Sequence, residues 1–177
     1  MNILSRLFVP FLTISIALIL SAQPTSVLAK NGTLNLSRLA RYDSKAKIPQ
    51  AVRDECDLES NLIESVQKYA EKNYEKVILV DSASAGTAGS ALDIRITHAL
   101  APKGGTSTGL KGLTIRGTLW RNGKAAGSFT AKRVTTGGAG LMGTCSMLHR
   151  CTKKLGKDVA RWLENPTMDA RLGELNY

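Results

Sequence analysis

Three cysteines and two histidines are the residues of this chain whose types and spacing could support nucleophilic chemistry. Cys145 comes directly before a segment predicted to be helical, and the dipole at a helix N-terminus lowers the pKa of a thiol. His149 lies four residues further on, on the same side of that helix, and His98 ends a predicted strand. An imidazole can serve as the base that activates a thiol. One hypothesis is therefore a small thiol-dependent enzyme that uses Cys145 with His149 or His98.

The same cysteines could instead form a disulfide bond. Cys56, Cys145 and Cys151 are an odd number, so we expect one bridge and one free thiol in an exported protein. Cys145 and Cys151 are six residues apart, and two helical residues at that spacing point to different sides. This favours a bridge from Cys56 to one of them, and a pair formed across the helix start stays an alternative. Two histidines without a C-x-x-C motif do not favour a structural zinc site.

Two glycine-rich stretches have the spacing of phosphate-binding loops. Gly138 to Gly143 reads G-x-G-x-x-G between a predicted strand and a predicted helix, where backbone N–H groups can cradle a pyrophosphate. A dinucleotide site also needs a following parallel strand with an acidic residue, but the chain reaches Pro166 instead. Gly104 to Gly109 has Walker-like glycine spacing, but Leu110 follows in place of lysine. We therefore expect no cofactor, and we interpret residues 137–143 as a strand-to-helix connection.

The stretch from Ile94 to Lys157 holds twelve lysines and arginines and no acidic residue. The candidate ligand-binding residues lie on the outer face of the predicted sheet, and they are Arg95, Arg116, Trp120 and Lys132. Cations attract phosphate or carboxylate groups, and an aromatic ring can stack on a ligand. The alternative is a solvated face, because exposed antiparallel sheets are commonly rich in these polar residues. The outer sheet face has a single aromatic residue, and an exported protein rarely meets nucleic acid, so we do not expect a nucleic-acid partner.

Residues 1–29 are typical of a signal peptide. Arg6 gives a positive start, Leu7 to Leu20 is mostly apolar, and small residues up to Ala29 offer a cleavage site. The apolar run is shorter than the roughly 20 residues of a membrane-spanning helix, although an uncleaved anchor stays an alternative. Cleavage leaves 148 residues with a net charge of +9, because Arg6 is the one charged residue lost. We expect a periplasmic or secreted protein with no transmembrane segment after signal removal.

Hydrophobic periodicity predicts a single α+β domain over residues 54–166, with a polar N-terminal segment at 30–53 and a C-terminal tail at 167–177. The expected fold is a mainly antiparallel sheet of about four strands with two helices packed on one face. Asn122-Gly123 predicts a hairpin, because both residues tolerate positive φ. One expected helix begins near Asp54, and the other spans residues 146–164. The expected strands are 77–80, 92–97, 110–120 and 128–132.

The last third of the chain reads Gly-Thr-Cys-Ser-Met-Leu-His-Arg-Cys-Thr-Lys-Lys-Leu-Gly-Lys-Asp-Val-Ala-Arg-Trp-Leu from Gly143 to Leu163. This pattern resembles small exported bacterial proteins of unassigned activity, and the resemblance covers roughly the second half of the chain. It implies a Gram-negative periplasmic or secreted context and carries over no catalytic residues.

The leading hypothesis is a non-catalytic binding or envelope-associated module whose basic sheet face meets an anionic envelope component. The alternative is the thiol-dependent enzyme built on Cys145. A third hypothesis has another envelope protein as the partner, bound at a sheet edge or at the open sheet face.

Overall fold

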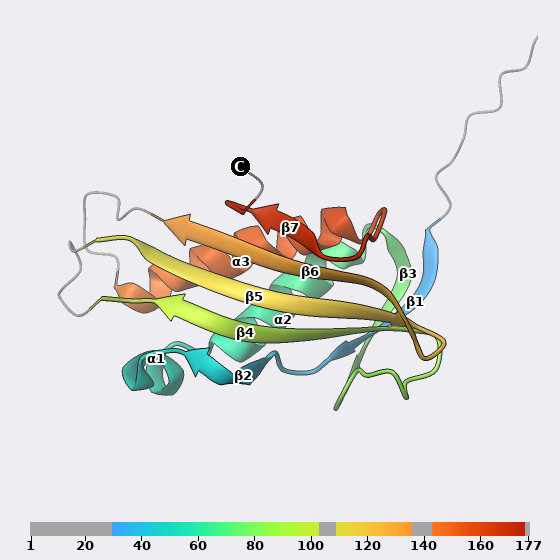
Figure 1. The fold of residues 1–177 in the computed structure, drawn as a ribbon, viewed down its shortest axis with the longest axis horizontal. Coiled ribbons are helices and arrows are strands. Elements are labelled where there is room, and N and C mark those ends of the chain that lie inside the picture. Colours follow the sequence, from blue (N-terminus) through green and yellow to red (C-terminus); the bar gives the residue numbers. More distant parts are fainter. Residues whose placement is uncertain (1–29, 103–108, 136–142, 176–177) are drawn as a thin grey trace, which may run out of the picture.

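A computed structural model describes residues 30–102, 109–135 and 143–175. One mixed β-sheet forms one layer, and two long helices cover one of its faces (Figure 1). The other sheet face carries no helix in the described ranges. The elements in chain order are β1 (Asn31–Ser37), β2 (Arg41–Lys47), α1 (Gln50–Glu55), α2 (Leu58–Ala70), β3 (Tyr74–Val80), β4 (Ser90–Leu100), β5 (Lys111–Arg121), β6 (Lys124–Thr135), α3 (Thr144–Trp162) and β7 (Ala170–Gly173).

The strands are hydrogen-bonded in the order β3-β1-β4-β5-β6-β7, and β2 pairs with β4 further along the same side as β1. The central strands β4, β5 and β6 are antiparallel, as predicted. Asn122 and Gly123 both have positive φ, at 49° and 79°, and they turn β5 into β6. The predicted hairpin is thus confirmed.

The core lies between the central strands and the two long helices. Alternate residues Leu92, Ile94 and Ile96 of β4 are fully buried, and the residues between them face away from the core. On α3 the buried stripe includes Leu148, Cys151, Leu155 and Val159, which was expected from its helical spacing. Two helices packed on one sheet face are therefore confirmed. No helix in the described ranges is long and apolar enough to span a bilayer.

The sheet is larger than predicted, because it has seven strands within the described ranges and is mixed rather than mainly antiparallel. β1 belongs to the segment predicted to be a polar N-terminal segment, but it is a strand that lies between β3 and β4 and is parallel to both. Leu34 and Leu36 of β1 are fully buried for that reason. A parallel pairing joins segments far apart in sequence, so neither a turn nor a local pattern announces it.

Two further strands come from segments that the sequence pattern assigned to a polar start and a loose tail. β2 has almost no apolar residues, and it forms by pairing with β4. β7 has four residues and forms by pairing in parallel with β6. Backbone hydrogen bonds to an already formed strand, rather than side-chain periodicity, make these two segments extended.

The first long helix begins later than predicted. Asp54 lies inside the short helix α1, which ends at Cys56. Asp57 then takes a left-handed backbone conformation with φ of 41°, and α2 begins after it. A left-handed residue cannot continue a right-handed helix, so the apolar stripe of α2 is aligned independently of α1.

The two long helices come closest at Gly156 of α3. A Cβ atom at this position would lie 2.7 Å from the backbone carbonyl carbon of Ser65 and 2.8 Å from its Cβ. Real Cβ atoms do not approach that closely, so only glycine allows α2 and α3 to pack at this distance.

We predict that Gly156→Ala destabilises the protein. Overpacking costs about 1–3 kcal/mol, and the better helix propensity of alanine offsets about 1 kcal/mol of that. A net loss of up to about 2 kcal/mol should lower the urea midpoint of unfolding. Gly86→Ala is the matched control, because the nearest atom there is 3.8 Å away in an exposed loop. Equal midpoints for the two variants would show that the helices are not in close contact.

Candidate anion-binding face

Cys56 and Cys145 form a disulfide bond that joins the end of α1 to the first turn of α3. This is one of the two bridges that the sequence favoured. Nε2 of His149 donates a hydrogen bond to the carbonyl oxygen of Cys56 at 2.6 Å, so this imidazole fastens the same junction. A bridged sulfur has no thiolate to act as nucleophile. The hypothesis of a thiol-dependent enzyme built on Cys145 is therefore wrong for the folded, oxidised protein.

His98, the other candidate base, belongs to the opposite side of the molecule. It pairs with Thr114 on the sheet face away from the helices, and it neighbours Lys47 of β2. The helix layer that holds Cys145 lies across the sheet from it (Figure 1).

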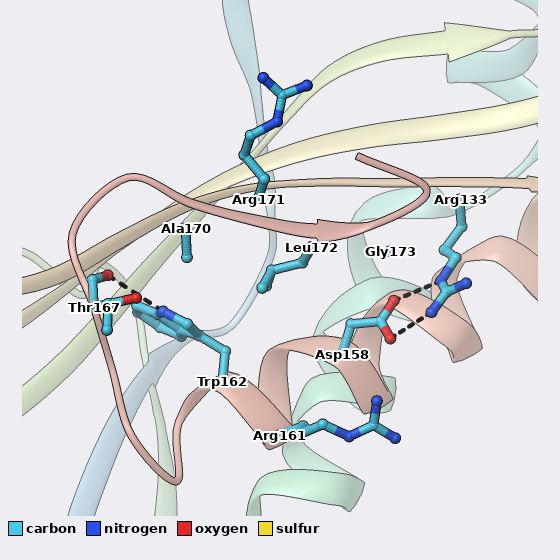
Figure 2. A pocket seen from close by; sticks show the side chains of 9 residues that line it. All are labelled: Arg133, Asp158, Arg161, Trp162, Thr167, Ala170, Arg171, Leu172 and Gly173. Atoms are coloured by element: carbon cyan, nitrogen blue, oxygen red, sulfur yellow. Dashed lines mark hydrogen bonds and ion pairs between the residues drawn. The ribbon is translucent and has the colours of Figure 1, made fainter. Parts of the chain in front are cut away.

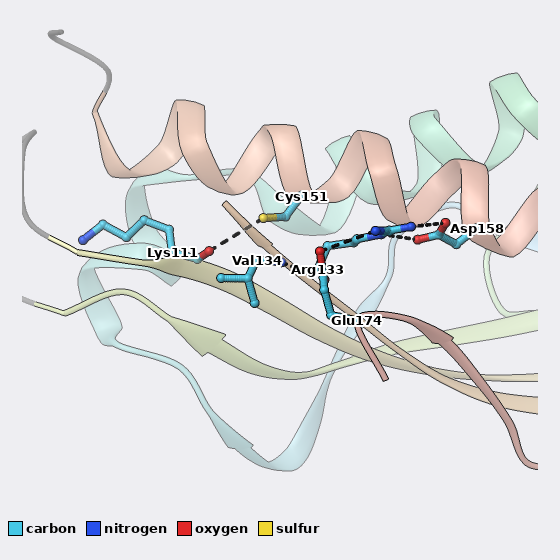
Figure 3. Close-up of polar contacts among 6 residues, drawn as sticks. All are labelled: Lys111, Arg133, Val134, Cys151, Asp158 and Glu174. Carbon is cyan, nitrogen blue, oxygen red and sulfur yellow. Dashed lines mark hydrogen bonds and ion pairs between the residues drawn. The ribbon is translucent and has the colours of Figure 1, made fainter. Parts of the chain in front are cut away.

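Cys151 is the free cysteine, and its thiol is buried. Burial raises the pKa of this thiol to about 11, and the charge of Glu174 adds to the increase. Its sulfur lies 4.0 Å from the backbone oxygen of Lys111 (Figure 3). A buried group that stays protonated at neutral pH is a packing residue.

The described residues form neither a metal centre nor a phosphate-binding loop. No three His, Cys, Asp or Glu side chains gather within the ranges 30–102, 109–135 and 143–175 in a way that could hold a metal ion. The glycine-rich stretches at 104–109 and 137–143 lie mostly outside those ranges, in residues 103–108 and 136–142. The open sheet face remains as the candidate site.

Cross-strand register lines up arginines on that open face. Arg95 of β4 is directly opposite Arg116 of β5, and Arg41 of β2 is paired to Arg95 on the other side. The same row continues through Thr130 of β6 to Arg171 of β7. Side chains directly opposite each other lie about 4.5–5.5 Å apart at Cβ. Three guanidinium groups thus come from three neighbouring strands in one row.

The adjacent row on the same face is also basic. Lys47, His98, Thr114 and Lys132 follow one another across β2, β4, β5 and β6. We call the six lysines and arginines of the two rows the basic band: Arg41, Lys47, Arg95, Arg116, Lys132 and Arg171. Arg95, Arg116 and Lys132 lie on predicted strands, whereas Arg41, Lys47 and Arg171 lie on strands that the sequence pattern does not predict.

The basic band is only partly neutralised by the protein itself. Arg95 forms an ion pair with Asp93 at 3.1 Å, and Arg41 donates a hydrogen bond to the hydroxyl of Ser82. The side chains of Arg116 and Lys132 make no ion pair or hydrogen bond with other residues of the described ranges. These two cations are thus available to an anion.

A shallow hollow adjoins the band between β5 and β6. Its volume is about 330 Å³, and it is lined by Arg116, Gly117, Thr118, Ser128, Phe129, Thr130 and Asp169. The hydroxyl of Ser128 donates a hydrogen bond to the carboxylate of Asp169 at 3.0 Å. Asp93 and Asp169 therefore border the band on one side, and hydroxyl groups line the hollow next to Arg116.

Trp120 is not brought together with the three cations. It pairs with Ala91 and Ala125 near the hairpin end of β5. Four residues separate it from Arg116, which is about 13 Å along a strand. The open face therefore holds the predicted arginines as one cluster, with the predicted aromatic residue apart from them.

A larger hollow lies elsewhere, between α3 and β7, with a volume of about 640 Å³ (Figure 2). Arg133 donates two hydrogen bonds to the carboxylate of Asp158, at 2.6 and 2.7 Å, and these bonds raise its pKa further. Glu174 also forms an ion pair with Arg133 and accepts a hydrogen bond from the backbone N–H of Val134 (Figure 3). Arg133 of β6 thus links Asp158 of α3 to Glu174, which follows β7, and the charges of these three residues are paired with one another.

We predict that Cys151 does not react with iodoacetamide in the native protein at pH 8. A thiol with a pKa of about 11 is almost fully protonated at that pH, and the side chain is buried. Mass spectrometry after alkylation without reductant should find no modified cysteine, and one alkylated cysteine after denaturation in urea. Rapid labelling of Cys145 in the native protein would contradict the bridge.

Comparison with known proteins gives structural neighbours but no sequence relatives. No protein-family model matches the chain, and no curated protein matches it. A PelC dodecamer from Paraburkholderia phytofirmans aligns with 73% of this chain and 89% of its own, at 14% identity and a TM-score of 0.47. A protein from Xanthomonas campestris of the family DUF330 aligns with 80% and 87%, at 9% identity and 0.46.

A minor lipoprotein from Acinetobacter baumannii aligns with 75% of this chain and 91% of its own, at 13% identity and a TM-score of 0.38. With identities this low and TM-scores below one half, these structures assign the chain neither a family nor an activity. Its function has to be inferred from its own surface chemistry.

Proposed function

We propose that this chain is a non-catalytic, exported binding module of the bacterial envelope that holds an anionic component on its open sheet face. The observation that carries the proposal is the row of Arg41, Arg95 and Arg116, directly opposite one another on three strands. Like charges in that arrangement destabilise a sheet. A bound anion attracts all three guanidinium groups and offsets the repulsion between them. The row of arginines therefore stabilises the protein when a ligand is bound.

The chemistry of the basic band suits phosphate or carboxylate groups. A guanidinium presents a planar fork of donors that binds either group with two hydrogen bonds. Arg116 and Lys132 have side chains without partners among the described residues, so they need no rearrangement before binding. The hydroxyl of Thr130 next to Arg116 can add a hydrogen bond. Such a face binds without catalysing a reaction.

Export supports the assignment to the envelope. Residues 1–29 have the pattern of a signal peptide, and the Cys56–Cys145 bridge is the kind of bond that persists in an oxidising compartment. The net charge of +10 for the full chain favours anionic surroundings.

A protein partner is the second candidate, and one feature favours it. β3 is an edge strand whose outer side has no partner strand in the described ranges, and its Val77 to Val80 stretch is apolar. Such an edge can pair with a strand of another protein. Association through β3 would depend little on salt, which separates it from anion binding.

We predict that Arg95→Gln, Arg116→Gln and Lys132→Gln together weaken binding to a heparin column without altering the fold. Each exposed charge contact contributes about 0.2–1 kcal/mol, so the triple variant should bind about tenfold more weakly. Elution at lower salt than the native protein is the expected result, because the interaction is screened.

The matched control replaces Lys76, Arg121 and Lys124 with Gln, which removes the same net charge from exposed positions on β3 and at the β5–β6 hairpin. It should elute close to the native protein. If both triple variants elute at the same salt concentration, retention follows net charge alone and the band is not a site.

A further inference from the structure

The open sheet face changes character along its strands. At one end Leu100 of β4, Gly112 of β5 and Val134 of β6 form a row. A Cβ atom on Gly112 would lie 3.4 Å from a methyl of Val134 and 3.7 Å from the Cβ of Leu100, so the two apolar side chains approach the bare glycine from both sides. Leu110, just before β5, is close by. We call Leu100, Leu110 and Val134 the apolar end.

Two residues of the apolar end are unusually exposed for their type. Leu100 is 39% exposed and Leu110 is 48% exposed, and only Leu39 and Met168 are comparable large apolar residues in the described ranges. Leu39 lies between β1 and β2, and Met168 lies before β7. The apolar end thus brings together two exposed leucines, one at the end of β4 and the other just before β5.

The basic band follows immediately. The row of Lys47, His98 and Lys132 is next to the apolar end, and the row of Arg95 and Arg116 comes after it. Successive rows on one sheet face are about 7 Å apart along the strands. Asp93 and its opposite Thr118 form the row beyond the arginines. Along the strands the face is therefore apolar, then cationic, then acidic.

Cations also flank the apolar end from the helix side. α3 begins at this end of the sheet (Figure 1). Exposed Arg150, Lys153 and Lys154 of α3 line a hollow together with Thr135, the last residue of β6. Glu174 is the carboxylate that reaches this part of β6, and Arg133 and the N–H of Val134 hold it. Basic residues thus lie on both faces next to the apolar end, and one acidic residue, Glu55 of α1, lines a hollow with Ala101 and Pro102 just after β4.

We propose that this end of the sheet docks on an anionic lipid bilayer, with Leu100 and Leu110 in the interface and the nearer row of the basic band, Lys47 and Lys132, at the depth of the lipid phosphates. The inference rests on the proposed function and names its anionic component. The headgroup layer of a bilayer is about 5–7 Å thick on each side, so the row of Lys47 and Lys132 lies at its depth. The arginine row lies about 7 Å further out, facing the anionic surface. Apolar residues beneath a cationic rim are typical of interfacial binding.

A soluble polyanion explains less of this arrangement. It would use the basic band alone, and it would leave Leu100 and Leu110 exposed to water. In the bilayer orientation Asp93 and Asp169 lie on the water side of the arginines, where the anionic surface repels them least. The order of the rows therefore favours lipid.

The first experiment measures sedimentation with vesicles of phosphatidylglycerol and phosphatidylcholine, or of phosphatidylcholine alone. The native protein should bind the anionic vesicles and hardly bind the neutral ones. Leu100→Ser with Leu110→Ser should bind the anionic vesicles about tenfold more weakly, because partial burial of two leucines is lost. Leu39→Ser with Met168→Ser is the matched control and should bind like the native protein. Far-ultraviolet circular dichroism verifies that both variants fold.

A second experiment reads the depth of docking. Leu110→Trp places a fluorescent residue at the apolar end, and Met168→Trp places one elsewhere on the surface. Brominated lipids in anionic vesicles should quench the added fluorescence of Leu110→Trp strongly and that of Met168→Trp little. The native Trp120 and Trp162 serve as the background in both variants. Equal quenching of the two added residues overturns the orientation.

The outcomes separate the inference from the proposed function. If the serine variant at Leu100 and Leu110 binds anionic vesicles like the native protein while the Arg95, Arg116 and Lys132 variant does not, the bilayer orientation is wrong and the anion-binding face stands. Retention on heparin without binding to phosphatidylglycerol vesicles has the same meaning. If the native protein binds neither anion, both the inference and the proposed function fail.

Discussion

The structure depends on the burial of one side of β4. Leu92, Ile94 and Ile96 each contribute about 1.5–3 kcal/mol when they leave water. Their alternation fixes which residues face away, and it also fixes the register with β5. Arg95 is placed opposite Arg116 as a consequence, at a cost of about 0.2–1 kcal/mol. Hydrophobic burial exceeds this repulsion several times over, so the fold can hold a row of like charges on its open face.

The parts of the fold that sequence could predict are those fixed by local patterns. β4, β5, β6 and α3 show clear periodicity, and the Asn122-Gly123 turn joins neighbours in sequence. β1, β2 and β7 are strands because of partners far along the chain, so their own side chains gave little signal. The candidate site was predicted to the same extent: Arg95, Arg116 and Lys132 lie on predicted strands, whereas Arg41 and Arg171 do not.

The cysteines show how a local argument can be correct in its premise and wrong in its conclusion. Cys145 does lie at the start of α3, where a free thiol would be acidified. The end of α1 brings Cys56 to the same place, and the two sulfurs bond. The left-handed backbone at Asp57, next to Cys56, separates α1 from α2. That backbone break had no counterpart in the hydrophobic pattern.

The position of β1 has a consequence for how an exported chain reaches this fold. β1 is the first strand of the sheet in sequence, yet both of its neighbours, β3 and β4, come later. A chain that crosses a membrane from its N-terminus presents Leu34 and Leu36 before any strand that could cover them has arrived. Until β3 emerges the leading segment has no sheet partner, and its second partner, β4, follows later still. Its apolar residues are therefore exposed to chaperones at the start of folding.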